Sequence, residues 1–65
     1  MSYNIMKVYA DGSKARSQTH DTLAQAQAGL VELAAGYDLV VEQHEDFVVV
    51  QRDDIQFKFE IVVAI

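Results

Sequence analysis

The chain has 65 residues, of which 51% are hydrophobic, with no cysteine, no proline and a formal net charge of −5. This length predicts one domain, residues 1–65, that is stabilised by packing, because disulfides and thiolate zinc sites are excluded. The acidic balance argues against direct binding of nucleic acid, which needs a basic stripe to neutralise phosphates.

The N-terminal residues do not resemble a targeting segment. The first ten, MSYNIMKVYA, mix polar and apolar types and lack the continuous apolar run of a signal peptide. No segment approaches the ~18 apolar residues of a membrane span. We therefore expect a soluble intracellular protein with no membrane partner.

The N-terminal part of the chain predicts a β-hairpin. Good strand formers over residues 3–10 predict the first strand. Asp11-Gly12 is the dipeptide typical of a tight type I′ turn, in which both residues take positive φ. The polar segment SKARSQT, residues 13–19, predicts an edge strand on which Lys14 and Arg16 discourage pairing with another molecule.

One helix is predicted between Thr22 and Gly36. Thr22 and Gln25 have the spacing of a capping box, and Gly36 is expected to end the helix in a left-handed conformation. Gly29 inside the helix is either a close-packing position or a tolerated defect. The residues that form one apolar stripe at helical spacing are Leu23, Ala26, Leu30, Leu33, Ala34 and Tyr37.

Three further strands are predicted over residues 38–43, 47–52 and 55–65. The last strand alternates clearly, and its apolar face consists of Ile55, Phe57, Phe59, Ile61 and Val63. The element order β-β-α-β-β-β predicts an α+β fold with one helix packed on a five-stranded, mainly antiparallel sheet.

Chain direction leaves two sheet orders open. In 2-1-5-4-3 the first and last strands pair centrally, whereas 1-2-3-4-5 is a right-handed meander with a parallel contact. In both orders, one end of the sheet carries Asp11, Asp38, Asp53 and Asp54. The other end carries His20, Asp21, His44, Glu45 and Asp46. Glu42 and Glu60 are expected to project from the face opposite the helix.

The acid excess lies entirely in the second half of the chain. Residues 1–36 hold three acids and three bases, whereas residues 37–65 hold seven acids and two bases. Strands lie about 4.8 Å apart, so carboxylates on a sheet can imitate the phosphate repeat of nucleic acid. Turn propensity and solubility are the plainer explanation. The predicted partner-binding residues, which would meet a basic protein surface, are Asp38, Glu42, Glu45, Asp46, Asp53, Asp54 and Glu60.

An apolar sheet face gives the alternative function. The stretch FVVV, residues 47–50, is apolar on both faces, and Val40, Val62 and Ala64 are expected opposite the helix. An uncovered apolar face is typical of an interface, which predicts a homodimerising accessory or structural domain. A curled sheet or a bulge would instead hide part of this face. If Val48 or Val50 faces outward, its replacement by lysine (Val48→Lys or Val50→Lys) should abolish such a dimer.

No catalytic residue, metal or cofactor is predicted. The serines lie at the terminus or in the polar hairpin, and the glycines are too few for a phosphate loop. Acids on turns lack the apolar pocket that raises a catalytic pKa. The two histidines come near acids at one end of the sheet, but the spacing is not that of a compact ligand set. We expect a protein that is not an enzyme.

The overall pattern resembles the small acidic anti-CRISPR proteins of phages and mobile elements. The likeness rests on the length, the element order and the acid-rich half from Asp38 to Glu60, with EQHED and QRDD at its turns. It covers the whole chain in outline and contains no shared motif. The resemblance implies a non-enzymatic inhibitor in the bacterial cytoplasm. Such an inhibitor binds a Cas effector subunit, more often of type I, and blocks its nucleic-acid-binding surface with acidic side chains. The basic Lys14 and Arg16 depart from full DNA mimicry.

Overall fold

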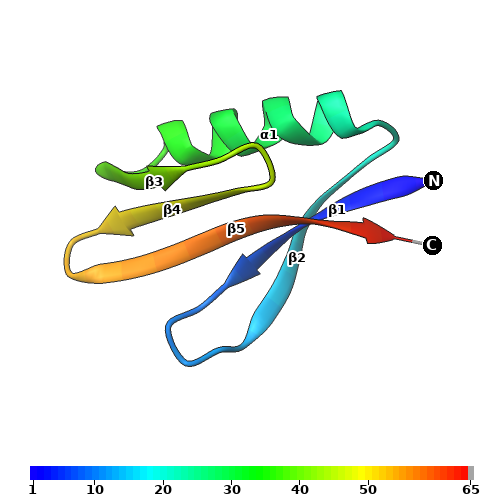
Figure 1. Cartoon of the computed structure of the whole chain (residues 1–65). Coiled ribbons are helices and arrows are strands. Elements are labelled where there is room, and N and C mark those ends of the chain that lie inside the picture. Colours follow the sequence, from blue (N-terminus) through cyan, green and yellow to red (C-terminus); the bar gives the residue numbers. More distant parts are fainter. Residues whose placement is uncertain (65) are drawn as a thin grey trace.

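The computed structural model describes residues 1–64 and confirms the α+β order, with one helix on a five-stranded antiparallel sheet (Figure 1). The elements are β1 (Ser2–Val8), β2 (Lys14–His20), α1 (Leu23–Ala35), β3 (Leu39–Gln43), β4 (Phe47–Arg52) and β5 (Ile55–Ala64). The last residue of the predicted final strand, 65, lies outside the described range.

The strand order is β2-β1-β5-β4-β3, which confirms the first of the two predicted orders and excludes the meander. β1 pairs with β5 along its whole length, from Ser2 opposite Ala64 to Val8 opposite Lys58. The two terminal strands therefore form the centre of the sheet, and β2 and β3 are its opposite edges.

The core lies between α1 and one face of the sheet. Its fully buried sheet residues are Ile5, Val48, Val50 and Phe59, and the helix adds Leu30 and Ala34. The predicted alternation of β5 is confirmed, because Phe57 and Ile61 also pack against this core. Leu23, predicted in the helix stripe, is 44% exposed at the first position of the helix.

Both helix ends involve side chains or tight turns. The capping box is confirmed: Gln25 N–H donates to Thr22 Oγ1 at 3.1 Å, and Gln25 Oε1 accepts from Thr22 N–H at 3.3 Å. Gly36 ends the helix, but the expected left-handed conformation is wrong, since its φ is −81°. Its N–H instead donates to Leu33 C=O at 3.2 Å, which closes the last turn tightly.

The β1–β2 turn is longer than predicted. Within this turn only Gly12 has positive φ, at 89°, and Tyr9 N–H donates to Ser13 C=O at 2.9 Å across a three-residue loop. The type I′ turn is therefore wrong, and the loop is of the kind in which a glycine follows a type I turn. The Ser13 hydroxyl and N–H both donate to Asp11 Oδ1, and these hydrogen bonds lower the pKa of that carboxyl.

The valine side chains of β4 alternate between the two faces of the sheet. Val48 and Val50 are fully buried on the helix side, so Val49 is the one that faces outward. Neither Val48→Lys nor Val50→Lys can test an outer interface, because both would bury a charge in the core. Val40 pairs with Val50 and lies on the helix side, contrary to the prediction. A bulge between Val40 and Glu42 causes the difference, and it leaves Glu42 on the outer face, as predicted.

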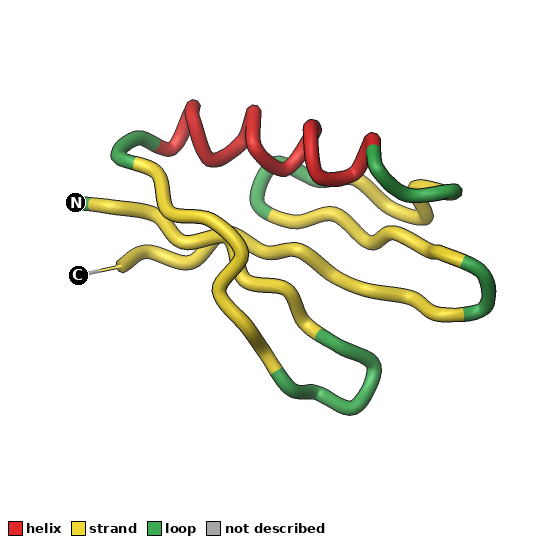
Figure 2. Tube along the Cα trace, turned by 180° about the vertical axis from the view of Figure 1, so that it is seen from behind, coloured by secondary structure: helices red, strands yellow, loops and turns green. Residues whose placement is uncertain are grey.

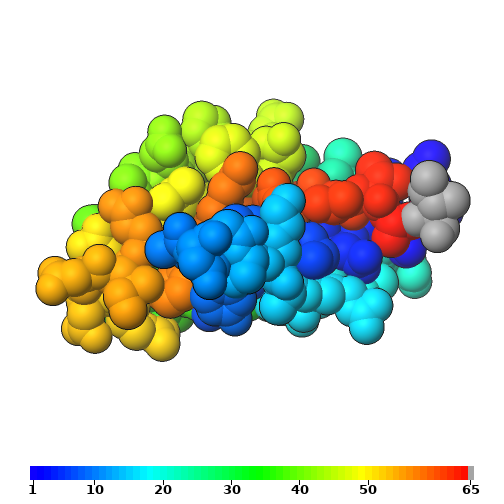
Figure 3. Space-filling model, turned by 90° about the horizontal axis from the view of Figure 1, so that it is seen from below, coloured from blue at the N-terminus to red at the C-terminus, as the bar shows by residue number. Residues whose placement is uncertain are grey.

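The outer face of the sheet is curled and crossed by charges. Val62 is 43% exposed there, as predicted, and Ala64 lies on the same side. The β1–β2 hairpin projects below the sheet (Figures 1 and 2), and in Figure 3 it stands in front of the face that points away from α1. Lys14 on β2 reaches past β1 to Glu60 on β5, with 3.0 Å between the charged atoms. The curl therefore reduces the open apolar area.

A cluster of aromatic rings and cations extends the core beyond the helix. Lys7 Nζ lies 4.3 Å from the centre of the Phe57 ring and 5.1 Å from that of Tyr9. The Arg52 guanidinium lies 4.6 Å from the Tyr37 ring and donates to Gly36 C=O at 2.8 Å. Cations over aromatic faces are favourable, so these long side chains cover apolar surface that the helix does not reach.

Gly29 is the point of closest approach between helix and sheet. A Cβ atom there would lie 2.7 Å from Gln18 Oε1, 2.9 Å from His20 Nε2 and 3.0 Å from Ile5 Cδ1. The first two atoms are themselves hydrogen-bonded at 2.7 Å. Of the two interpretations of this glycine, close packing is therefore the correct one.

We predict that Gly29→Ala destabilises the protein although alanine is the better helix former. Overpacking typically costs about 1–3 kcal/mol, and the middle of this range exceeds the roughly 1 kcal/mol gained in helix propensity. The free energy of unfolding in urea should fall by about 1 kcal/mol net. Ala28→Gly, on the exposed side of α1, calibrates the propensity alone. A more stable Gly29→Ala variant would show that the contact relaxes without cost.

Candidate functional site

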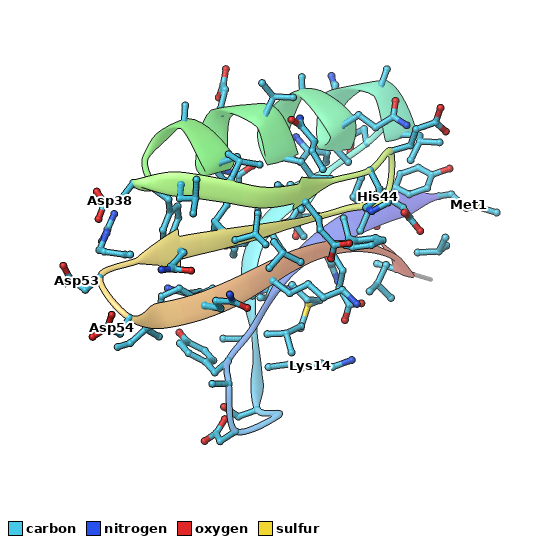
Figure 4. All side chains as sticks on the ribbon, turned by 60° about the vertical axis from the view of Figure 1, so that its left-hand side comes forward. Met1, Lys14, Asp38, His44, Asp53 and Asp54 are labelled. Atoms are coloured by element: carbon cyan, nitrogen blue, oxygen red, sulfur yellow. The ribbon has the colours of Figure 1, made fainter. Side chains whose placement is uncertain are left out.

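Three acids meet at one end of the sheet, as the sequence predicts. Asp38, Asp53 and Asp54 lie together where β3 begins and β4 turns into β5 (Figure 4). Asp53 N–H donates to Asp38 Oδ2 at 3.4 Å, and all three residues are exposed. We call these three residues the Asp38 end. Asp11 follows β1 at the same end of the strands, as predicted, because Val8 pairs with Lys58 near the start of β5; its β1–β2 turn projects away from the rest of the sheet (Figure 1).

The Asp38 end depends on a left-handed residue. Asp53 has a φ of 54°, a conformation that aspartate and asparagine tolerate better than most side chains. The Gln51 amide donates to Asp53 C=O at 3.0 Å and holds the turn from the side. The sequence thus places a carboxylate where the turn itself selects Asp or Asn.

Three further acids lie at the opposite end of β3. Glu42 is the penultimate residue of β3 and lies on the outer face, and Glu45 and Asp46 belong to the turn into β4. We call these three residues the Glu45 end. Its turn is held by Asp46 C=O, which accepts from Ile61 N–H at 2.8 Å. His44 stacks on Phe47 at 4.3 Å between ring centres (its position is labelled in Figure 4).

The two ends do not form one compact carboxylate cluster. The five residues of β3 lie between Asp38 and the turn that carries Glu45 and Asp46, and they span roughly 17 Å. His20 is distant from both, because it lies on β2 at the other edge of the sheet. Within residues 1–64 no group of three or more histidines and acids is arranged to hold a metal ion.

Glu60 differs from the other six predicted partner-binding residues. It projects from the outer face, as predicted, but its side chain is only 21% exposed between Lys14 at 3.0 Å and Lys58 at 3.6 Å. The hydrogen bond from Lys14 is the main reason that the pKa of Glu60 is lowered, and burial opposes it. Its charge is therefore already matched within the chain.

The negative charges of the remaining six predicted partner-binding acids are not neutralised by lysine or arginine among the described residues. Among the described residues, the one salt bridge that involves them joins Glu42 to His44 at 3.9 Å, and it requires protonated histidine. The two bases of this half are engaged elsewhere: Arg52 with Gly36 and the Tyr37 ring, and Lys58 with Glu60. Like charges without partners create a negative potential that attracts a basic surface.

Sequence reasoning missed the free edge of β3, which lies between the two acidic ends. All five residues of β3 are exposed, and Leu39, Val40 and Val41 are 53%, 41% and 42% exposed. An open groove of about 460 Å³ adjoins the end of this strand. The residues that line it are Gln27, Leu30, Val31, Gln43, His44 and Glu45. The signal in the sequence that could have indicated this open edge is the absence of lysine and arginine from residues 39–43.

Comparisons with known proteins add no relative to this geometry. No family model matches the chain, and neither does any curated protein or solved structure.

The helix α1 has 13 residues, and within the described range no helix is long and apolar enough to cross a membrane.

We predict that the ion pair of Glu60 makes stability depend on pH. Because its folded pKa lies below the ordinary 4.5, the stabilisation is present above pH 4.5 and is lost as the pH falls through the folded value. Glu60→Gln should lower the free energy of unfolding at pH 7 by about 0.5–1 kcal/mol, as for a surface ion pair. The difference from wild type should vanish at strongly acidic pH, as measured by urea unfolding.

Lys14→Gln is the matched variant for this prediction. It removes the main cause of the shift and should move the pKa of Glu60 back toward its ordinary value, which carboxyl NMR can follow. An unchanged pKa in Lys14→Gln would mean that the two side chains do not pair in solution.

Proposed function

We propose that this chain is a non-enzymatic inhibitor that binds a basic protein surface, of the kind that otherwise holds nucleic acid. The observation that carries the proposal is the placement of six exposed acids at the two ends of β3, without lysine or arginine partners among the described residues. These acids are Asp38, Glu42, Glu45, Asp46, Asp53 and Asp54.

The spacing of the charges supports partial mimicry of a nucleic-acid backbone. The Asp38 end and the turn that carries Glu45 and Asp46 are roughly 17 Å apart, which is about the axial rise of five base pairs of duplex DNA. A long basic groove can therefore contact both ends at once. Lys14 and Arg16 lie on β2, at the far edge, so the mimicry is confined to the β3–β5 half of the molecule.

The resemblance to anti-CRISPR proteins supplies the first target to test. We propose a Cas effector subunit of a type I surveillance complex, met in the bacterial cytoplasm. Acidic side chains at the rim of an interface mainly raise the association rate and make binding sensitive to salt. Inhibition by the chain should therefore weaken as the salt concentration rises.

Two double variants test the role of the acids. Glu45→Gln with Asp46→Asn neutralises one end, and Asp53→Asn with Asp54→Asn neutralises the other. Asparagine is chosen for residue 53 because it tolerates the left-handed conformation there. Each pair should weaken inhibition of target-DNA binding by a type I complex about tenfold in a gel-shift titration, and should flatten its salt dependence.

The matched control is Asp21→Asn with Glu32→Gln, which removes the same charge from exposed acids outside both ends. This control should inhibit like the wild type. An equal loss of inhibition in the control would mean that only the net charge of the chain matters, and not the position of the acids. Unchanged inhibition in both test variants would refute the proposal.

The homodimerising domain is the second candidate, and the exposed Val62 and outward Val49 favour it. The pairing of Glu60 with Lys14 and Lys58 across the same face weighs against it. If this face forms a dimer, the mass in sedimentation equilibrium should rise with concentration, and Val49→Lys should abolish the rise. A monomer at all concentrations would exclude this candidate.

A further inference from the structure

The two edges of the sheet are protected to different degrees. The β2 edge carries Lys14 and Arg16, which discourage another strand from pairing. The β3 edge presents Leu39, Val40 and Val41, and no basic residue. An edge strand exposes unpaired backbone donors and acceptors, so β3 can accept a sixth strand.

The helix provides a second wall beside this edge. The groove of about 460 Å³ runs between Gln27 and Val31 of α1 and the end of β3. Val31 is 55% exposed, and Leu30 forms the apolar floor. A strand added to β3 would place alternate side chains in this groove, which is how peptides commonly extend a sheet.

We propose that the β3 edge and the adjoining groove bind an extended segment of the partner protein, apolar at its centre and basic at both ends. This inference rests on the proposed function and names how the basic partner is held. Backbone hydrogen bonds to β3 supply the attachment, and the two acidic ends select lysine or arginine beyond each end of the segment.

Charge argues against a second copy of this chain as the occupant. Antiparallel pairing of two β3 strands about a two-fold axis would place the Asp38 end of one copy beside the Glu45 end of the other. Both ends are acidic, and like charges at an interface oppose association. A segment with basic ends has the opposite, attractive arrangement.

The length of β3 sets the length of the segment. Five residues span roughly 17 Å, so basic side chains should flank a core of about five residues. Since both ends of β3 are acidic, charge does not select the direction of the added strand. The expected pattern is therefore one or two basic residues, five apolar or β-branched residues, and basic residues again.

The test uses the blocked peptide KRVTVTVRK and the isotope-labelled chain. The peptide should shift the NMR signals of residues 39–43 and slow their amide hydrogen exchange. Two control peptides separate the contributions: EDVTVTVDE reverses the end charges, and KRVTVTVRK with every amide of VTVTV N-methylated cannot pair with a strand. Each control should bind at least about tenfold more weakly.

Val41→Lys places a positive charge on the edge and should reduce peptide affinity at least about tenfold. Val62→Lys is its matched control, because Val62 is 43% exposed against 42% for Val41 but lies on β5. Val31→Lys, on the helix wall, gives a second route to the same loss and keeps a good helix former. Val62→Lys should bind like the wild type.

The outcomes separate this inference from the proposed function. One outcome is that neutralising the acid pairs weakens peptide binding while Val41→Lys and Val31→Lys leave it unchanged. In that case the partner is held elsewhere and the inference is overturned, while the proposed function stands. If only the lysine variants weaken binding, the edge accepts strands regardless of charge, and the basic partner is overturned. A free chain that dimerises until Val41 is replaced would show that a second copy occupies the edge.

Discussion

The pairing of β1 with β5 is the interaction on which the remaining structure depends. It joins the first and last strands over seven residue pairs and places Ile5 opposite Ile61 in the centre of the sheet. Once these strands are neighbours, the short connections leave β2 and β3 as the two edges. The helix can then cover β1, β5 and β4 together, and it packs closely enough that a Cβ atom at position 29 would displace the side chains of Gln18 and His20.

This topology also separates the charges. Lys14 and Arg16 belong to one edge, the acids of the β3 and β4 ends belong to the other half, and Glu60 lies between them, paired with lysine. A chain with a net charge of −5 thereby acquires a polar axis across its sheet. An oriented field of this kind favours one angle of approach to a basic surface, which a uniformly acidic protein of the same charge would not.

Periodic patterns and the coarse topology were readable from the sequence, and local irregularities of the backbone were not. The capping box of Thr22 and Gln25 and the alternation of β5 were predicted correctly, because each depends on neighbours in the chain. The left-handed Gly36 and the type I′ turn were wrong, since other backbone hydrogen bonds satisfied those positions. The side of Val40 was wrong because a bulge interrupts the alternation. The open edge of β3 could be recognised only once the strand order was known.

The paired ends of β1 and β5 have a practical consequence for how the chain can be tethered. Ser2 lies opposite Ala64, so sequence attached before one or after the other would leave the domain from the same side, where β1 begins and β5 ends (Figure 1). Asp46 also bonds to Ile61 near that side, which makes it the side of the Glu45 end. A bulky fusion at either terminus would therefore crowd the Glu45 end and leave the Asp38 end open.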